Sequence, residues 1–234
     1  MDKFNITGGI PLHGEITPGG NKNAALPLIA ACLLTEEPVI LHNVPDIRDV
    51  QSMIALIESL GVNITRLAPN SIKIHAREIH PTDLDPDLCR KIRASILLAG
   101  PMVAKKGELQ LPPPGGDVIG RRRVDTHLLA IEKLGAEIEY DRAFKFKANG
   151  LIGADILLDE TSVTATENAI MASVLALGKS TIRNAASEPH VQELCHFLNL
   201  LGAKISNIGS NTLNIEGVEA LHGEVHQRRW HEAD

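Results

Sequence analysis

The sequence Leu60-Gly61-Val62-Asn63-Ile64 occurs in related form at two later places, Leu134-Gly135-Ala136-Glu137-Ile138 and Leu201-Gly202-Ala203-Lys204-Ile205. A glycine directly after an apolar helix end is typical of a C-cap, because glycine adopts a left-handed backbone at little cost. Self-similarity of this kind indicates internal structural repeats. A frequent helix-to-strand turn is the alternative, but the similarity extends over the residues that precede each leucine. We therefore predict three copies of one folding unit.

An amphipathic helix pattern precedes each Leu-Gly pair. Apolar residues recur three, six, seven and ten positions before the leucine, as one buried helix face requires. His127 is the exception, a polar residue in an apolar position. The predicted faces are Val50, Met53, Ile54, Ile57 and Leu60; Val124, His127, Leu128, Ile131 and Leu134; and Val191, Leu194, Cys195, Leu198 and Leu201.

A second, more apolar helix is expected ahead of each amphipathic one, at residues 23–34, 94–104 and 168–177. These segments lack a polar face, so such helices have to be enclosed on every side. Three of them predict a central bundle of buried parallel helices, with the units related by pseudo-threefold symmetry.

Short β-like runs complete each unit. Alternating apolar and polar residues are typical of half-exposed strands. Each unit is predicted to hold two helices and about four strands, which gives an α/β fold with sheets outside the helices. The runs are residues 38–42, 108–111 and 180–183 between the two helices of a unit, and 72–74, 144–146 and 213–215 after the Leu-Gly pair.

The composition favours a globular protein and argues against nucleic acid as a partner. The 234 residues are 44% hydrophobic, which suffices for a sizeable core. Only 3% are aromatic and the net charge is -6, whereas a nucleic-acid binder usually presents a basic face and stacking rings. The basic run Arg121 to Arg123 is too short to serve as an electrostatic footprint for a duplex.

The three cysteines, Cys32, Cys89 and Cys195, are scattered, so no disulfide framework or zinc site is predicted. A reducing, cytoplasmic setting fits this pattern. The first residues lack a signal-peptide pattern, and no stretch approaches the about 18 apolar residues of a membrane span. No metal site is expected at the tail histidines, which are His222, His226 and His231.

Two basic residues stand at the expected starts of the apolar helices. Lys22 lies in Gly19-Gly20-Asn21-Lys22-Asn23-Ala24-Ala25, and Arg93 has the matching place in the second unit. Thr166-Glu167-Asn168 stands there in the third unit. Helix N-termini attract anions, and parallel helices would bring the two cations together. We predict an anion site; a solvated lysine is the alternative for Lys22 alone, since the spacing is not that of a P-loop.

Residues 111–125 form the most unusual segment, Leu-Pro-Pro-Pro-Gly-Gly-Asp-Val-Ile-Gly-Arg-Arg-Arg-Val-Asp. Proline and glycine at this density predict an exposed loop, and long loops in compact domains are commonly functional lids. The loop carries Asp117 and three arginines before the next helix. The alternative is a simple connector in which Asp117 is a turn residue.

Several of these segments resemble motifs of the UDP-N-acetylglucosamine enolpyruvyl transferases, the first committed enzymes of peptidoglycan synthesis. The segments are Gly20-Asn21-Lys22-Asn23-Ala24-Ala25-Leu26-Pro27, Arg93 to Ile96, Pro114 to Asp125, and Ser162 to Asn168. The resemblance covers residues 1 to about 220. It implies an inside-out α/β barrel of the enolpyruvyl transferase type, and it makes the chain similar to the N-terminal half of that family's members.

The resemblance implies transfer of the enolpyruvyl group of phosphoenolpyruvate to the 3-hydroxyl of UDP-N-acetylglucosamine, with release of phosphate and without a cofactor. The catalytic residues that it implies are Asp117, Lys22 and Arg122. Two alternatives are an inactive fragment that binds the sugar nucleotide and, less favoured, 3-phosphoshikimate 1-carboxyvinyltransferase, whose lysine motif reads Ser-Lys-Ser. The implied substrate-binding residues are Lys22, Asn23, Arg93, Arg122, Arg123, Val124, Asp125, Thr126, Glu160, Thr161, Ser162 and Val163.

Some positions depart from the family pattern. Asp117 stands where most members have the loop cysteine that protonates phosphoenolpyruvate. The aspartate form resembles a known variant of the family, and its pKa, normally about 3.9, would have to rise. Without a thiolate we expect resistance to the epoxide antibiotic fosfomycin. Arg123 replaces the usual proline, and Glu160, where some members have lysine, would repel a diphosphate unless it points away.

Members of the family are much longer than this chain. Comparison with them predicts how the chain is divided into domains. The second domain, with the aspartate that takes the sugar hydroxyl proton, is expected to be absent, so a second chain would have to supply it. The expected parts are a strand and hinge at 1–21 that pair with that domain, a transferase domain at 22–220 with repeats at about 22–80, 81–150 and 151–220, and a divergent tail at 221–234.

Overall fold

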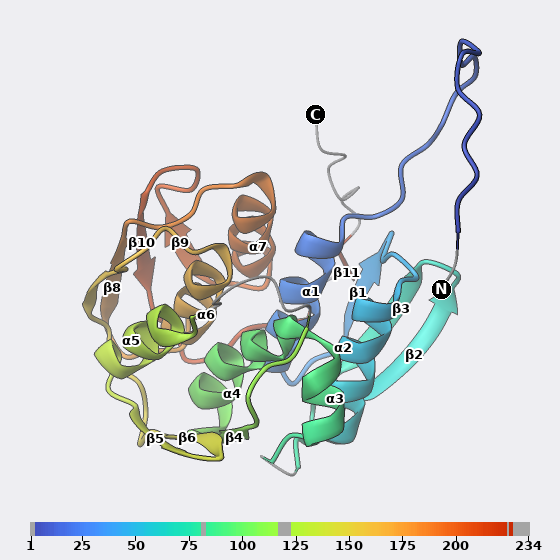
Figure 1. The fold of residues 1–234 in the computed structure, drawn as a ribbon. Coiled ribbons are helices and arrows are strands. Elements are labelled where there is room, and N and C mark those ends of the chain that lie inside the picture. Colours follow the sequence, from blue (N-terminus) through green and yellow to red (C-terminus); the bar gives the residue numbers. More distant parts are fainter. Residues whose placement is uncertain (1–2, 81–82, 117–122, 224, 227–234) are drawn as a thin grey trace.

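The helices lie towards the centre of the molecule and the sheets towards its outside (Figure 1). The computed structural model describes residues 3–80, 83–116, 123–223 and 225–226. Of the predicted loop, Asp117, Arg121 and Arg122 therefore lie outside the described residues. Within the part described, no helix is both long enough and apolar enough to span a bilayer.

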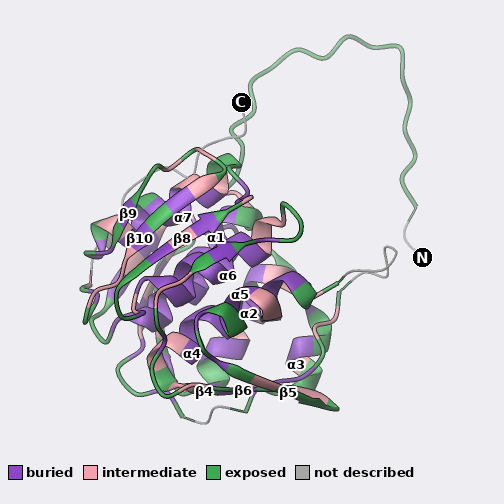
Figure 2. Cartoon of the chain, turned by 90° about the vertical axis from the view of Figure 1, so that its left-hand side faces the viewer, coloured by how far each residue is buried: buried purple, intermediate pink, exposed green. Residues whose placement is uncertain are grey.

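The predicted bundle of apolar helices is confirmed. Every residue of the first helix from Ala24 to Ala31 is buried, because the surrounding units cover it on all sides (Figure 2). The central elements are α1 (Lys22–Ala31) with η1 (Cys32–Leu34), η2 (Arg93–Leu98) with α4 (Ala99–Lys106), and α6 (Val163–Ser173).

The third central helix differs from its predicted bounds. We expected it at 168–177, whereas α6 begins at Val163 and ends at Ser173. Its N-cap is Ser162, whose side-chain oxygen accepts a hydrogen bond from the Ala165 backbone N–H at 3.4 Å. The first turns of α6 contain polar residues that are nevertheless buried, so a pattern of apolar residues starts too late to mark the helix.

The amphipathic helices are confirmed with their buried faces. In the first one, Val50, Met53 and Ile57 are buried. The Leu-Gly pairs end these helices as predicted: Gly61, Gly135 and Gly202 have φ values of 88°, 99° and 100°, in the left-handed region. The elements are α2 (Arg48–Ser59), α5 (Asp125–Lys133) and α7 (Pro189–Leu200); a further short helix, α3 (Pro86–Lys91), was not predicted.

Each unit builds the same antiparallel sheet. The orders β1-β3-β2, β4-β6-β5 and β8-β10-β9 are equivalent, so the repeat read from the sequence holds for strand topology as well. The strands are β1 (Val39–His42), β2 (Asn63–Ala68), β3 (Ser71–His75), β4 (Glu108–Leu111), β5 (Glu137–Asp141), β6 (Ala143–Lys147), β8 (Lys179–Arg183), β9 (Lys204–Ser206) and β10 (Thr212–Glu216).

Each sheet is extended by a parallel segment that follows, along the chain, the last strand of the preceding unit in the ring. β7 (Asp155–Leu157) pairs parallel to β8, and an isolated parallel bridge joins Asp83 to Gln110 of β4. β11 (Val225–His226) returns to pair parallel to β1, which closes the ring of three units. The Thr35 hydroxyl supports the closure by donating to the Leu221 carbonyl oxygen at 2.9 Å.

Residues 3–20 carry no helix or strand and extend away from the rest of the protein (Figure 1). Phe4, Ile6 and Leu12 are 90%, 88% and 97% exposed. Exposed apolar side chains of this size are typical of a surface that another element covers. The expected pairing of residues 1–21 with a second domain remains a prediction.

Replacing Gly100 by alanine is expected to lower the free energy of unfolding by about 1–3 kcal/mol. The added Cβ would lie 2.5 Å from the main-chain oxygen of Asn168, so α4 and α6 would have to separate. Gly8→Ala is the control, because an added Cβ there meets nothing within 4 Å. Urea unfolding followed by circular dichroism measures both variants. Unchanged stability of Gly100→Ala would contradict the close contact of the two helices.

Candidate active site

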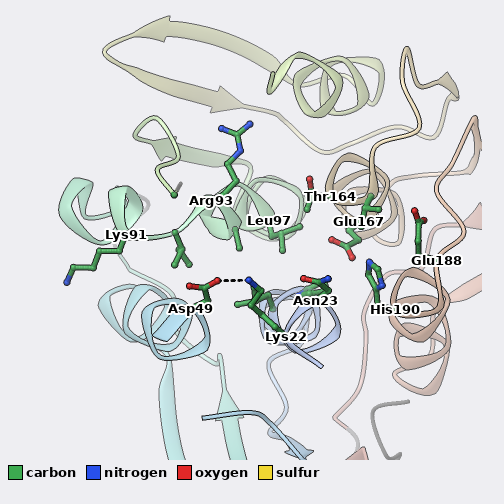
Figure 3. Close-up of a pocket in the computed structure, with 16 residues that line it drawn as sticks. Lys22, Asn23, Asp49, Lys91, Arg93, Leu97, Thr164, Glu167, Glu188 and His190 are labelled. Carbon is green, nitrogen blue, oxygen red and sulfur yellow. Dashed lines mark hydrogen bonds and ion pairs between the residues drawn. The ribbon is translucent and has the colours of Figure 1, made fainter. Parts of the chain in front are cut away.

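A pocket of about 620 Å³ lies where the three central helices begin. α1 contributes Lys22 and Asn23, η2 contributes Arg93, and α6 contributes Thr164 and Glu167 (Figure 3). The expected convergence of Lys22 and Arg93 is thus present in the structure. Backbone N–H groups and two cations at converging helix starts favour an anionic ligand.

Local structure around Lys22 is fixed by the turn ahead of α1. Asn21 caps the helix, because its side-chain oxygen accepts from the Asn23 backbone N–H at 2.8 Å. Gly20 has to be glycine, since a Cβ there would collide with the main-chain oxygen of Asn43. Lys22 Nζ lies 3.0 Å from Asp49 Oδ2, with side chains 47% and 41% exposed. An ion pair this exposed is weak, so a bound anion can compete for the lysine.

Arg93 joins the pocket to the segment after the predicted lid. Its guanidinium donates to the main-chain oxygen of Arg123 at 3.0 Å. Gly116, the last described residue before the loop, also lines the pocket, and its backbone N–H donates to the Arg90 carbonyl oxygen at 3.4 Å. Both described ends of the loop therefore contact the short stretch from Arg90 to Arg93.

A cluster of charged groups stands beside the pocket. Arg123 Nε lies 2.7 Å from Asp125 Oδ2, and the same guanidinium lies 3.8 Å from Asp159 Oδ2. The hydrogen bond from Arg123 to Asp125, followed by the charges of Asp125, Asp159 and Glu160, raises the pKa of Arg123. Thr126 donates to Asp159 Oδ1 at 2.6 Å. Of the two departures from the family pattern, Glu160 thus adds a small favourable charge effect on Arg123, which pairs with Asp125 and Asp159.

The predicted site residues fall into separate groups in the structure. Val163 lines the pocket with Lys22, Asn23 and Arg93. Thr161 instead donates to the Asn184 side-chain oxygen at 2.7 Å. The residues that do not line this pocket are Arg123, Val124, Asp125, Thr126, Glu160, Thr161 and Ser162; Asp117 and Arg122 lie outside the described residues.

The sequence did not mark several pocket residues as site candidates. Asp49 comes from α2, and Glu188 and His190 stand at the start of α7 (Figure 3). Desolvation by burial lowers the pKa of His190. Glu167 belongs to the third unit's equivalent of Lys22 and to the family-like segment Ser162 to Asn168, but neither pattern assigns it a role in the site. That equivalence was the available signal for Glu167, whereas nothing in the local pattern of α2 or α7 indicates a pocket.

The polar exception in the helix pattern, His127, is buried behind the pocket. Its Nδ1 accepts a hydrogen bond from the Asn168 side-chain amide at 2.8 Å, which leaves Nε2–H to donate to the Thr164 hydroxyl at 3.2 Å. Burial, with a smaller effect from the charge of Arg93, lowers the pKa of His127 to about 3. The imidazole is therefore neutral and joins α5 to α6.

Fold and pocket together define an α/β protein of three repeated units with cations at converging helix starts. A sequence model of the family described as EPSP synthase (3-phosphoshikimate 1-carboxyvinyltransferase) matches residues 6–227. The chain belongs to this family of carboxyvinyl (enolpyruvyl) transferases.

Within this family, curated relatives show which members the chain is similar to. UDP-N-acetylglucosamine 1-carboxyvinyltransferase from Treponema denticola is 56% identical over 227 residues, which is 97% of this chain and 53% of the relative. The Bradyrhizobium diazoefficiens protein of the same name is 57% identical over 226 residues, 97% of this chain and 52% of the relative. The resemblance inferred from the sequence is confirmed, and the chain spans about half the length of the curated relatives it matches.

Solved structures support the fold. The enolpyruvyl transferase NikO from Streptomyces tendae has a TM-score of 0.80 at 23% identity and covers 93% of this chain and 52% of its own. EPSP synthase from Acinetobacter baumannii has a TM-score of 0.71 at 18% identity and covers 91% of this chain and 48% of its own. The predicted enolpyruvyl transferase fold is therefore confirmed.

His127→Gln is expected to reduce the loss of stability on acidification. The folded pKa of about 3 is below the ordinary 6.5, so His127 contributes stability above about pH 6.5 that is lost as the pH falls towards 3. Between these two pKa values the free energy of unfolding falls by up to about 1.4 kcal/mol for each pH unit of acidification. Melting temperatures between about pH 7 and about pH 4 measure it. His13→Gln, in the exposed N-terminal segment, is the control; parallel curves for both variants would contradict a buried neutral His127.

Proposed function

We propose that this chain provides the phosphoenolpyruvate site of a UDP-N-acetylglucosamine 1-carboxyvinyltransferase. The reaction transfers the enolpyruvyl group of phosphoenolpyruvate to the 3-hydroxyl of UDP-N-acetylglucosamine and releases phosphate, in peptidoglycan precursor synthesis. The pocket with Lys22, Asn23 and Arg93 at converging helix starts carries the proposal. The names of relatives that are 56% and 57% identical support the choice of sugar nucleotide.

The charges of the pocket suit phosphoenolpyruvate. This small molecule carries a phosphate and a carboxylate close together, and two separate cations with backbone N–H groups can hold both. Arg93 supplies a planar group that can bind two oxygens, whereas Lys22 supplies a point charge that can follow the phosphate as it leaves. Asp49, which now pairs with Lys22, would give up this contact when the anion binds.

The chemical steps are addition and then elimination. In the proposed mechanism the acid on the loop, Asp117, gives its proton to the methylene carbon of phosphoenolpyruvate. The sugar 3-hydroxyl oxygen attacks the neighbouring carbon, and its proton passes to a base from a second domain. The Asp117 carboxylate then takes a proton back from the methyl group, and departure of phosphate restores the double bond. Asp117 can act as the acid only where its pKa rises above the usual value of about 3.9, as closure over a dry site would cause.

A second candidate function is ligand binding without turnover by this chain alone. The observation that favours it is length, since the chain spans about half of the curated relatives. Under this second candidate function, a second domain or chain would complete the site and supply the base for the sugar hydroxyl. The shikimate 3-phosphate reaction is less favoured, because the relatives at high identity carry the sugar-nucleotide name.

Phosphate release from phosphoenolpyruvate by the purified chain tests the proposal. We expect release that depends on UDP-N-acetylglucosamine and falls by at least about 100-fold in Asp117→Ala, because a general acid contributes that much. Lys22→Ala should also lose activity, whereas Lys145→Ala, at an exposed position of β6, is the matched control. A folded chain that binds both substrates but releases no phosphate would favour the second candidate function instead.

Fosfomycin is expected to leave the chain unmodified, since a carboxylate is a far weaker nucleophile towards the epoxide than a thiolate. The buried Cys32, Cys89 and Cys195 are also protected, and burial raises the pKa of Cys89 and Cys195 to about 12. Intact-mass spectrometry after incubation measures the outcome. The variant Asp117→Cys should gain one adduct, whereas an adduct on Asp117 itself would refute the expectation.

A further inference from the structure

Glu167 is a buried acid at the inner wall of the pocket. Its side chain is on the second turn of α6, and the residue is only 1% exposed. Its Oε1 atom has no hydrogen-bond partner among the described residues. Figure 3 shows the carboxyl group pointing into the space between Asn23 and His190. A buried polar atom that lacks a partner usually has a ligand or water as its missing partner.

The described cations of the pocket do not pair with Glu167. Lys22 pairs with Asp49, Arg93 donates to the Arg123 main-chain oxygen, and the side chain of Lys91 points away from Glu167 (Figure 3). An ionised carboxylate buried without a partner costs several kcal/mol, so a group in this position keeps its proton instead. Desolvation by burial, and then the negative charge of Glu188, raise the pKa of Glu167 well above its ordinary value.

No charged group on the other described elements around α6 favours ionisation of Glu167 strongly enough to remove its proton. Charged residues of α4, β8 and β10 reach solvent. Of the closer groups, His127 is neutral, and Cys195, whose pKa is raised, is a neutral thiol. The titratable and charged groups nearest to Glu167 are Glu188, His190 and Cys195 of α7, His127 of α5, and Arg93 of η2, with Lys22 and Asp49 across the pocket.

We infer that Glu167 is a ligand-binding residue whose carboxylic O–H donates a hydrogen bond to an anionic oxygen of the ligand. A protonated carboxyl has one O–H donor, and a hydrogen bond to an anion is stronger than one between neutral groups. An ionised Glu167 would instead repel the same oxygen. The inference rests on the proposed function, because it takes phosphoenolpyruvate as the ligand.

This role makes affinity depend on pH in a definite direction. Below the raised pKa of Glu167 the proton is present and the anion is held; above it the carboxylate repels the anion. Glu167→Gln keeps a donor of the same size and cannot ionise. Glu167→Leu keeps the volume and has no donor. The two variants therefore separate hydrogen bonding from charge and from packing.

The experiment is calorimetric titration of the 234-residue chain with phosphoenolpyruvate alone, so that no turnover contributes heat, at about pH 7 and about pH 9. We expect Glu167→Leu to weaken binding about tenfold or more at the lower pH, and Glu167→Gln to remain within about threefold. The unmodified chain should lose affinity at the higher pH by a larger factor than Glu167→Gln. Inorganic phosphate as a second probe shows whether the phosphate or the carboxylate of phosphoenolpyruvate is the acceptor.

The outcomes separate this inference from the proposed function. Binding that Lys22→Ala removes but both Glu167 variants leave intact would overturn the role of Glu167 alone. Equal losses in Glu167→Gln and Glu167→Leu would also overturn it, because a retained donor should rescue binding. No binding of phosphoenolpyruvate by the folded, unmodified chain would overturn both. Glu193→Gln, a buried acid of α7 that does not line the pocket, is the matched control for loss of a buried carboxyl.

Discussion

The side-chain amide of Asn168 holds the central helices together. Its oxygen accepts from the Gly100 backbone N–H at 2.7 Å, and its nitrogen donates to the Ile96 carbonyl oxygen and to His127, each at 2.8 Å. η2, α4 and α5 are thereby fixed to α6 by one residue. The relative position of Arg93, at the start of η2, and Thr164, at the start of α6, depends on this network, and so does the shape of the pocket.

The same bundle is apolar where it is structural and polar where it meets the pocket. The length of α1 beyond its first turn is packed with aliphatic residues, whereas α6 buries Thr166, Glu167 and Asn168 near its start. Polar groups in a dry interior are costly unless each has a partner. Asn168 and His127 satisfy each other, and Glu167 is left with an oxygen that a ligand can satisfy.

Closure of the ring keeps the helix starts at one end of the protein. The three units follow one another in sequence, and the last contact, between β11 and β1, is made by residues more than a hundred positions apart. Thr35 and Glu37 after α1 bind the Leu221 carbonyl oxygen and the Gly223 backbone N–H, so the end of the third unit is fixed to the first. The pocket lies at the axis of this ring, where every unit contributes a helix.

The sequence alone determined the repeat, the two kinds of helix and the cations Lys22 and Arg93, because periodicity, glycine C-caps and helix starts are local signals. It placed α6 too late, since buried polar residues interrupt the apolar pattern at its start, and it missed the short helix α3, in which only Cys89 is buried. Only the tertiary structure decided that Asp49, Glu167, Glu188 and His190 share one pocket with those cations. Their meeting depends on packing between helices far apart in the chain, and no local pattern records which side chains such packing leaves without partners.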